Sequence, residues 1–312
     1  MPTILAGDVG GTKTLLALFE PRTGGLDLVR EKRFASGEHG SLQEIVTAFL
    51  AAGPATRVEA ACFGVAGPVL SGVCRATNLP WRIDAADLVE VGRTPNVALI
   101  NDMEAAAYGM LHVGPDGLAP LNPKAGPVRG GNVAVLAAGT GLGESILYWD
   151  GREHHAVASE GGHVDFAPHT DREIELLRFL RARYGGHVSY ERVLSGPGLH
   201  NIYAFLRAST QAGEPAWLHD ALLEGDPPAV ITRVGLEEAD PVCVEALEMF
   251  AHVYGVEAGN LALKCLALGG VYLGGGIAPR ILPVLRRGSF LRGFTDKGRL
   301  SGLLERIPVA VS

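Results

Sequence analysis

The stretch "LAGDVGGTKTLLALFE" (Leu5–Glu20) decides the fold, because it places a polar, glycine-rich turn between two apolar runs near the start of the chain. The apolar runs, residues 3–7 and 14–19, predict two strands joined by a hairpin at Gly10-Gly11. A surface hairpin needs only a turn, yet this one offers further polar groups. They are Asp8, Thr12 and Lys13. The surplus indicates that the turn binds a ligand.

A second hairpin repeats this architecture in the middle of the chain. The segment "NVAVLAAGTGLGESILYW" (132–149) again has an apolar run, a Gly/Thr turn and a second apolar run. Because the two hairpins lie about a domain's length apart, they suggest two halves with related cores. A third glycine-rich segment, "LGGGIAP" (273–279), lies where a strand meets a helix.

The three turns together predict a nucleotide-binding site. Backbone N–H groups in tight turns can surround phosphate, and glycine supplies positive φ angles and close approach. Neither hairpin matches a P-loop or a dinucleotide fingerprint, because a strand follows each turn where a helix should begin. A single glycine-rich hairpin favours ordinary turn chemistry over ligand binding, and only two hairpins together make the two interpretations equal. As a set, two hairpins would hold the phosphates and the third turn would lie against the adenosine.

The rest of the chain alternates strands and helices, which predicts an α/β fold. Apolar residues recur at helical spacing over residues 41–53, and "NVALI" (96–100) is a strand that leads into a helix. From Thr170 to about Ala267 the periodicity is mainly helical. With 312 residues the chain is long enough for two domains, and no low-complexity linker separates them.

Polar residues at the end of the 96–100 strand suggest a site for a second substrate. Asn101 and Asp102 stand at the start of the next helix, and Glu104 completes a possible capping box. A carboxylate in the first helical turn is held ionised by the helix dipole, as a general base requires. The capping interpretation and the catalytic one do not exclude each other.

Two further segments add hydrogen-bonding groups. "SEGGHVDF" sets Glu160 and His163 around two glycines, which would let a small polar molecule approach the backbone, and "VSYERVLSGPGL" contains Glu191. Taken singly, His163 is consistent with a structural histidine and Glu191 with a solvated helix face. Carboxylates, an amide and an imidazole together suit a polyhydroxylated ligand, because each sugar hydroxyl both donates and accepts hydrogen bonds.

Composition excludes several other classes of protein. The net charge of -7, without a basic stripe, argues against nucleic-acid binding. The four cysteines are too scattered for a disulfide framework or a structural zinc site. Asp8 interrupts the first apolar run, and the most apolar later segment contains Lys264 and several glycines, so neither a signal peptide nor a membrane span is expected. We expect a cytoplasmic protein.

The ordered motifs resemble the bacterial glucokinase family of the hexokinase/actin superfamily, from Leu5 almost to the C-terminus. The phosphate hairpins are "GDVGGTKT" and "GTGLG", and the adenosine motif is "GGVYLGGGIAP". The sugar-side elements are "TNLPW", "INDMEAAAYG", "EGGHVDFAP" and "ERVLSGPGL". The resemblance implies ATP and Mg²⁺ as cofactors and transfer of the γ-phosphoryl group to the 6-hydroxyl of glucose in glycolysis.

The resemblance also assigns roles to residues. Asp102 would be the general base. The residues that would bind the sugar are Asn78, Asn101, Asp102, Glu160, His163 and Glu191. The residues that would surround the nucleotide are Asp8, Gly10, Gly11, Thr12, Gly139, Thr140, Gly141, Gly274, Gly275 and Gly276. Asp8 would also hold Mg²⁺, directly or through water.

The family implies a two-domain actin-like ATPase (ribonuclease H-like) fold, with nucleotide and sugar bound in a cleft that closes on glucose. We expect a small domain over residues 1–112, completed by the tail from about 300 to 312, and a large domain over 113–299. The family also implies a homodimer.

Three alternatives remain open. Lys13 is more typical of the related ROK sugar kinases, although the cysteine-rich zinc motif of that group does not follow His163 here. The acceptor could also be another hexose. A sugar-sensing regulator on the same fold is disfavoured by the net charge and by the complete Asp102 site.

Overall fold

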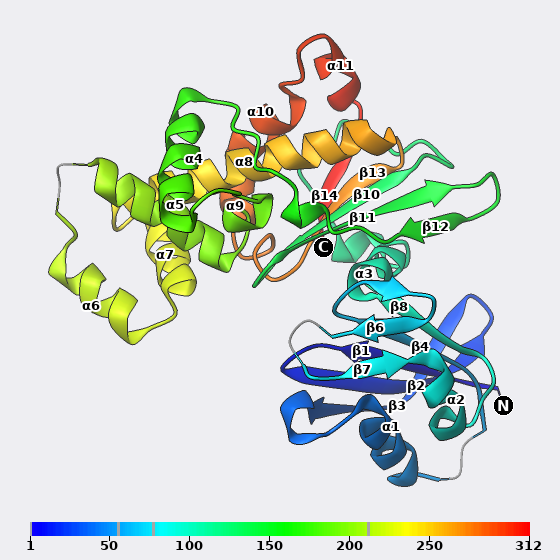
Figure 1. Cartoon of the computed structure of the whole chain (residues 1–312). Coiled ribbons are helices and arrows are strands. Elements are labelled where there is room, and N and C mark those ends of the chain that lie inside the picture. The colour runs from blue at the N-terminus through cyan, green and yellow to red at the C-terminus, as the bar shows by residue number, and fades with distance from the viewer. Residues whose placement is uncertain (1, 55–56, 77–78, 211–212) are drawn as a thin grey trace. The chain divides into compact units, whose positions relative to one another are not determined.

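The computed structural model describes residues 2–54, 57–76, 79–210 and 213–312. The chain forms two compact units, Met1–Ala106 and Ala107–Ser312, and each has the mixed helices and strands that the sequence predicted (Figure 1). Within the described residues, no helix has both the length and the apolar character needed to cross a membrane.

The first unit is built on a five-stranded sheet in the order β3-β2-β1-β4-β8. These strands are β1 (Thr3–Val9), β2 (Lys13–Arg22), β3 (Gly25–Ala35), β4 (Val58–Val65) and β8 (Val97–Asn101). A small sheet is made of β5 (Val69–Leu70), β6 (Val73–Arg75) and β7 (Arg82–Asp84). The helices are α1 (Leu42–Ala51), α2 (Ala85–Gly92) and the start of α3 (Asp102–Met110).

The opening hairpin forms as predicted, with β1 and β2 antiparallel. Its apolar residues enter the core of the first unit, where Leu5, Leu16 and Phe63 are fully buried. Helix α1 adds Ile45 and Phe49 from one face, because apolar residues three to four positions apart lie on the same side of a helix. The hairpin turn is therefore anchored on a packed sheet.

Three parallel strands bring their carboxyl ends to one edge of this sheet. Strand β4 pairs with β1 on one side and with β8 on the other. In the register of these pairs, Val65 lies opposite both Val9 and Asn101. Because the segments that follow parallel strands emerge at one edge, the turn after β1 and the start of α3 lie on the same side of the unit.

The second unit is built on a six-stranded sheet in the order β12-β11-β10-β13-β14-β9. These strands are β9 (Ala119–Pro120), β10 (Val133–Ala138), β11 (Leu142–Trp149), β12 (His154–Val157), β13 (Gly270–Gly274) and β14 (Val309–Val311). Its α-helices are α4 (Asp171–Tyr184), α5 (Gly196–Ser209), α6 (Ala216–Glu224), α7 (Pro227–Leu236), α8 (Pro241–Cys265), α9 (Leu282–Leu285), α10 (Ser289–Thr295) and α11 (Ser301–Leu304). Short 3₁₀ turns lie at Ser36–Glu38 (η1, in the first unit), Pro115–Gly117 (η2), Gly161–His163 (η3), Tyr190–Arg192 (η4) and Gly298–Leu300 (η5).

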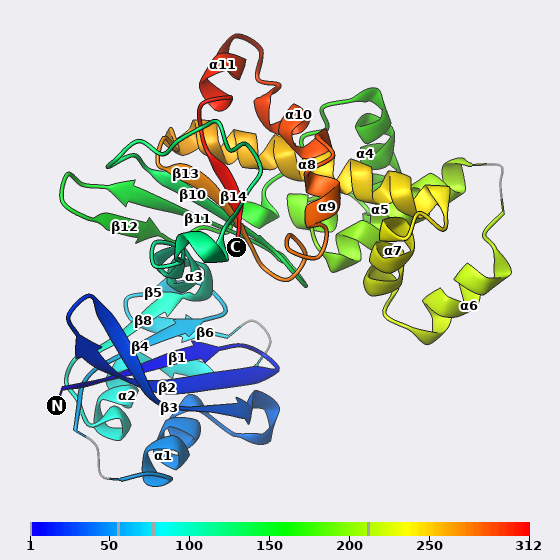
Figure 2. The same ribbon diagram turned by 180° about the vertical axis from the view of Figure 1, so that it is seen from behind.

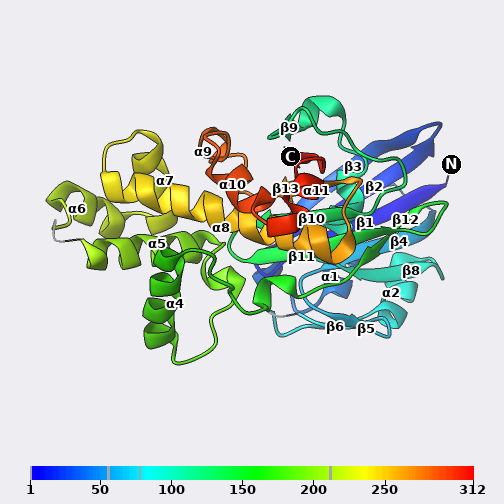
Figure 3. The same cartoon turned by 90° about the horizontal axis from the view of Figure 1, so that it is seen from above.

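The long helix α8 organises the second unit. Its N-terminal part packs with α5 and α7, and its C-terminal part lies along the sheet, where it contacts β10 (Figure 3). Phe250 and Tyr254 of α8 are fully buried in this core. Helix α8 thus joins the helical part of the unit to the sheet that positions the second hairpin.

The C-terminal tail differs from the sequence expectation. We expected residues from about 300 to 312 to complete the small domain, but β14 pairs parallel with β13 and antiparallel with β9. It therefore belongs to the sheet of the second unit, where Figure 2 shows it in red. The boundary between the compact units also falls at Ala106, earlier than the expected 112. Pairing of a short strand such as Val309–Val311 depends on its neighbours, which the sequence does not reveal.

Candidate active site

The turn of the first hairpin is held by Ser36, which is fully buried. Ser36 Oγ donates to the Gly10 carbonyl over 2.8 Å, and the Ser36 N–H donates to the Thr12 carbonyl over 3.1 Å. The side chains of Asp8, Thr12 and Lys13 remain exposed. The backbone of the turn is therefore held by the buried Ser36, while its polar side chains face solvent.

The second hairpin is also held in place, by backbone hydrogen bonds within the second unit. The Gly139 N–H donates to the Gly141 carbonyl over 2.8 Å, and the Gly196 N–H donates to the Gly139 carbonyl over 2.8 Å. A side chain at Gly139 would meet no atom within 4 Å, so this backbone is open to a ligand. Thr140 is exposed beside it.

The glycines of these two turns are not explained by positive φ angles, contrary to our expectation. Among the glycines predicted to bind nucleotide, only Gly275 has a positive φ, of 80°. At Gly141 an added Cβ would lie 2.5 Å from Glu191 Oε2. Glycine here therefore makes room for the side chain of Glu191, which is predicted to bind the sugar. Open backbone and close packing are the physical reasons for glycine in the hairpins.

The third turn lies beside the second hairpin, because β13 runs parallel to β10. Gly275 packs so closely on the Ala138 carbonyl that a Cβ would collide with it, and the Ile277 N–H donates to that carbonyl over 3.2 Å. At Gly276 a Cβ would meet nothing within 4 Å. The predicted phosphate and adenosine segments of the second unit are thus neighbours at the ends of adjacent strands.

The capping interpretation of Asn101 is confirmed. The Met103 N–H donates to Asn101 Oδ1 over 2.8 Å, and Glu104 Oε2 accepts the Asn101 N–H over 2.9 Å. Asn101 Nδ2 also donates to the Gly67 carbonyl over 3.2 Å, and the residue is only 5% exposed. Asn101 therefore fixes the junction of β8 with α3.

Asp102 occupies the first turn of α3 and is half-buried. Its Oδ1 accepts the Met103 N–H over 2.9 Å, which orients the carboxylate. A Cβ at Gly64 would lie 3.0 Å from Ala105 Cβ, so glycine at this position of β4 lets α3 approach the sheet. Asp8 lies near the carboxyl end of β1, and Asp102 follows the carboxyl end of β8 at the same edge of the sheet. Because β4 lies between β1 and β8, these two strand ends are about 10 Å apart.

The second unit contains three residues that are predicted to bind the sugar, and they lie close together, with His163 between Glu160 and Glu191. Its Nε2 lies 3.9 Å from Glu160 Oε2, and its Nδ1 lies 4.0 Å from Glu191 Oε1. The other oxygen of Glu191 accepts the Leu142 N–H over 3.1 Å. The side chains of Glu160, His163 and Glu191 are 55%, 58% and 31% exposed. An imidazole between two accessible carboxylates offers both donors and acceptors to a ligand.

The pair Gly161-Gly162 serves packing, and the expectation that it opens the backbone to a ligand is wrong. A Cβ at Gly162 would collide with the Leu142 carbonyl, and a Cβ at Gly161 would collide with the Glu144 carboxyl group. The missing side chains therefore let η3 lie directly against β11. This contact fixes the turn that holds His163.

Glu144 is a buried acid that our reading of the sequence did not consider as a site residue. It lies opposite Leu136 in the β10–β11 pair and is 1% exposed, and its Oε1 has no hydrogen-bond partner among the described residues. Burial and the nearby carboxylate of Glu257 raise the pKa of Glu144 to about 8, although Lys264 acts in the opposite direction. The only sequence signal was a glutamate within a mainly apolar strand.

The donor set fits Mg²⁺ only with help from phosphate. Among the residues that the structure describes, no group of three or more His, Cys, Asp or Glu could hold a metal ion. Mg²⁺ in kinases is typically bound by one or two carboxylates together with substrate phosphates, and the exposed Asp8 at the first hairpin could supply one. Asn78, the remaining predicted sugar ligand, lies outside the described residues.

Comparisons with known proteins agree over the whole chain. A family model described as glucokinase matches residues 5–312. A glucokinase of Synechocystis sp. is 41% identical over 98% of this chain and 93% of its own length, and a glucokinase of Nostoc punctiforme is 40% identical over 100% and 95%. The crystal structure of a glucokinase from an Antarctic psychrotroph superposes with a TM-score of 0.86 at 30% identity, covering 100% of this chain and 94% of that one.

The fold is accordingly the two-domain actin-like ATPase fold of these kinases. The resemblance noted in the motifs is confirmed over nearly the full sequence. The chain belongs to the glucokinase family of ATP-dependent hexose kinases.

Proposed function

We propose that this protein transfers the γ-phosphoryl group of ATP to the 6-hydroxyl of glucose, giving glucose 6-phosphate, with Asp102 as the general base. The family match over residues 5–312 carries this proposal, because that range includes every residue to which we assign a role. Phosphoryl transfer depends mainly on positioning and on stabilisation of charge, so each role below concerns one of these.

Asp102 is assigned to the proton of the reacting hydroxyl. The Met103 N–H and the dipole of α3 favour its ionised form, which a general base needs. Asn101 fixes the start of α3 through both atoms of its amide. We assign Asn101 to positioning Asp102, and its remaining hydrogen-bonding capacity to the sugar.

Glu160, His163 and Glu191 are assigned to the other hydroxyls of the sugar, together with Asn78. Because Glu191 Oε2 is engaged by the Leu142 N–H, its Oε1 is the atom available to a hydroxyl. The two carboxylates accept hydrogen bonds, and the imidazole can donate one.

The hairpins and the third turn are assigned to the nucleotide. In the first unit Asp8, Gly10, Gly11 and Thr12 would contact phosphate, and in the second unit Gly139, Thr140 and Gly141 would do so. Gly274, Gly275 and Gly276 would lie at the adenosine. When bound, Mg²⁺ would neutralise charge on the phosphates, and Asp8 would hold it directly or through water. We also propose a cytoplasmic homodimer, which rests on the family resemblance alone.

A coupled assay that detects ADP, with ATP, Mg²⁺ and a panel of hexoses, tests the proposal. We expect turnover on glucose and much slower turnover on mannose, fructose and N-acetylglucosamine. Preferred turnover of another hexose would keep the mechanism and replace the substrate. No turnover on any sugar, with ADP or polyphosphate as the donor as well, would refute the proposed function.

A further inference from the structure

Two buried acids lie behind the short turns that present the proposed sugar ligands. Glu144 of β11 is 1% exposed and Glu257 of α8 is 0% exposed. They interact electrostatically, since the charge of Glu257 raises the pKa of Glu144. Both lie in the second unit, and neither has a part in the phosphoryl transfer described above.

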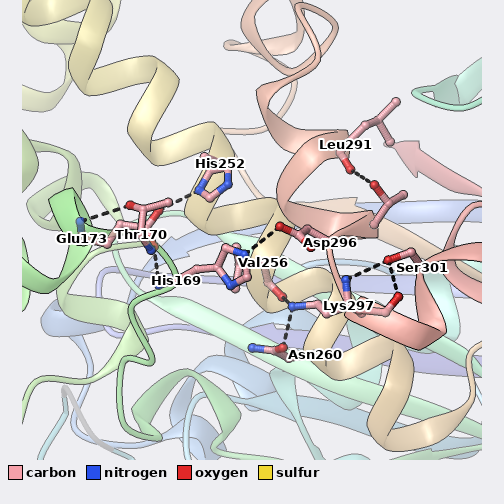
Figure 4. Close-up of polar contacts among 12 residues, drawn as sticks. His169, Thr170, Glu173, His252, Val256, Asn260, Leu291, Asp296, Lys297 and Ser301 are labelled. Atoms are coloured by element: carbon pink, nitrogen blue, oxygen red, sulfur yellow. Dashed lines mark hydrogen bonds and ion pairs between the residues drawn. The ribbon is translucent and has the colours of Figure 1, made fainter.

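Glu257 is compensated by its neighbours. Lys264 Nζ lies 3.3 Å from Glu257 Oε1, and Asn260 Nδ2 donates to Glu257 Oε2 over 2.9 Å. Lys297 Nζ in turn donates to Asn260 Oδ1 over 2.7 Å and to the Val256 carbonyl over 3.0 Å, as Figure 4 shows. Glu257 therefore has both a cationic partner and a hydrogen-bond donor, as a buried carboxylate requires.

Glu144 has no such compensation. Its Oε1 is buried without a hydrogen-bond partner among the described residues. The titratable groups that interact with it from α8 are Glu257, Tyr254 and Lys264, and only Lys264 favours its ionised form. On the side of η3 it faces the backbone of Gly161, and His163 follows on the same turn. Burial raises the pKa of Glu144 to about 8, so at neutral pH the carboxyl group keeps its proton.

Both acids connect to the sugar ligands through short paths. The Glu144 carboxyl group lies in close contact with Gly161, where a Cβ would collide with it, and Gly161 directly follows Glu160 at the start of η3. Glu257 reaches η4 through Asn260, whose Nδ2 also donates to Tyr190 Oη over 3.1 Å. Tyr190 immediately precedes Glu191.

We propose that protonated Glu144 is a positioning residue for glucose binding, because it lets the Glu160–His163 segment pack directly on β11. This proposal rests on the proposed function. Loss of the proton would place an unpaired charge next to Glu257, and burial of such a charge is costly. The segment would move to let water reach the carboxylate, and Glu160 and His163 would move with it. Glucose binding would weaken, whereas the wild-type arrangement would persist in any variant that stays neutral at residue 144.

The test compares the wild type with Glu144→Gln, which keeps the shape of the protonated acid and cannot ionise. In the wild type the glucose KM should rise about tenfold from about pH 7 to about pH 9, because only about one-tenth of the acid stays protonated one pH unit above its pKa. The Glu144→Gln variant should keep the neutral-pH glucose KM throughout. The ATP KM of both proteins serves as the reference, since any effect of alkaline pH on Mg-ATP is the same for both.

Glu173→Gln is the matched control. Glu173 of α4 is also a buried acid of the second unit. Unlike Glu144, it has hydrogen-bond partners for both of its carboxylate oxygens, which are His252 and the His169 N–H (Figure 4). This control should keep the wild-type dependence of the glucose KM on pH. An equal alkaline rise in Glu144→Gln and the wild type, or no rise in the wild type, would overturn the proposal.

Infrared difference spectra test the proton itself. The wild type at neutral pH should show a protonated carboxyl band that Glu144→Gln lacks and Glu173→Gln retains. Absence of that band in the wild type would overturn the proposal.

The proposed function and the positioning role of Glu144 fail in different ways. Glucose turnover without the alkaline effect refutes only the role of Glu144, whereas a wild type that neither binds nor phosphorylates glucose refutes the proposed function and the positioning role with it.

Discussion

Asp102 combines an oriented carboxylate with a position at the end of a buried strand, and replacement by asparagine separates these properties. The carbonyl oxygen of the new amide could still accept the Met103 N–H, so α3 should start normally. The amide could not take a proton from the sugar hydroxyl. We expect Asp102→Asn to fold normally and to lose at least about 10²-fold in kcat, with the ATP Kd unchanged. Stopped-flow nucleotide binding and steady-state kinetics measure the two quantities, and near-wild-type turnover would exclude Asp102 as the base.

The ligands around His163 should affect affinity more than turnover. Glu160 and His163 are more than half exposed, so Glu160→Gln and His163→Ala should leave the fold intact. Each removes a charged or polar partner of a sugar hydroxyl, and we expect the glucose KM to rise about tenfold or more because a hydrogen bond to a charged group contributes about 1.5–3 kcal/mol. An unchanged glucose KM in both variants would place the sugar pocket elsewhere.

The role of a single residue could be predicted where it depends on residue type and sequence position. It could not be predicted where it depends on residues that only the fold brings into contact. Asn101 as a helix cap followed from its position between a strand and a helix, and the structure confirms it. No sequence pattern singled out Glu144, because its burial against Gly161 and Glu257 is a property of the folded unit. The same dependence explains why Gly161-Gly162 was wrongly read as an opening for a ligand.

At the scale of elements, α4 illustrates how a helix start is tied to the core. Thr170 Oγ1 accepts the Glu173 N–H over 3.3 Å, and Glu173 Oε2 accepts the Thr170 N–H over 3.3 Å, which is a capping box. Glu173 Oε1 also lies 2.6 Å from His252 Nδ1 of α8 (Figure 4). One side chain therefore caps α4 and fastens it to α8.

This arrangement predicts a specific acid sensitivity. Burial alone would raise the pKa of Glu173, but hydrogen bonds from His252 and from the backbone of His169 and Thr170 lower it overall. A lowered pKa in the folded state means that Glu173 stabilises the fold above its unfolded pKa of about 4.3 and that this stabilisation is lost as the pH falls through the folded value. In urea titrations Glu173→Gln should be less stable than the wild type at neutral pH, and the difference should shrink on acidification. A difference that grows toward low pH would contradict this assignment.

Elements with strong periodicity were predictable and short paired elements were not. Both hairpins and helix α1 follow from apolar spacing and turn residues, and the structure confirms them. Strand β3 was missed because most of its side chains are exposed and many are charged. Strand β14 was assigned to the other domain, because a three-residue strand takes its place from β13 and β9.

At the scale of the whole molecule, each unit has its own hydrophobic core. Phe63 of β4 is fully buried in the first core and Phe250 of α8 in the second. Phe63→Ala and Phe250→Ala should each destabilise their own unit by about 3–5 kcal/mol, through lost transfer free energy and a residual cavity. Calorimetry should show two transitions, each lowered by one of the substitutions. A single transition that both substitutions lower equally would mean that the units unfold together.

Glucose should link these transitions, because the proposed ligands come from both units. Asp102 and Asn101 belong to the first unit, whereas Glu160, His163 and Glu191 belong to the second. A ligand that binds only the folded state stabilises it by about 2.7 kcal/mol at about 100 times its Kd, and a ligand shared by two units must stabilise both. We therefore expect saturating glucose to raise both transitions in the wild type. Asp102→Asn should keep this effect, because its amide can still hydrogen-bond a sugar hydroxyl. Glu160→Gln combined with His163→Ala should weaken it in both units. If glucose raised only the second transition, the residues of the first unit would not be sugar ligands, and the role of Asp102 would have to be assigned anew.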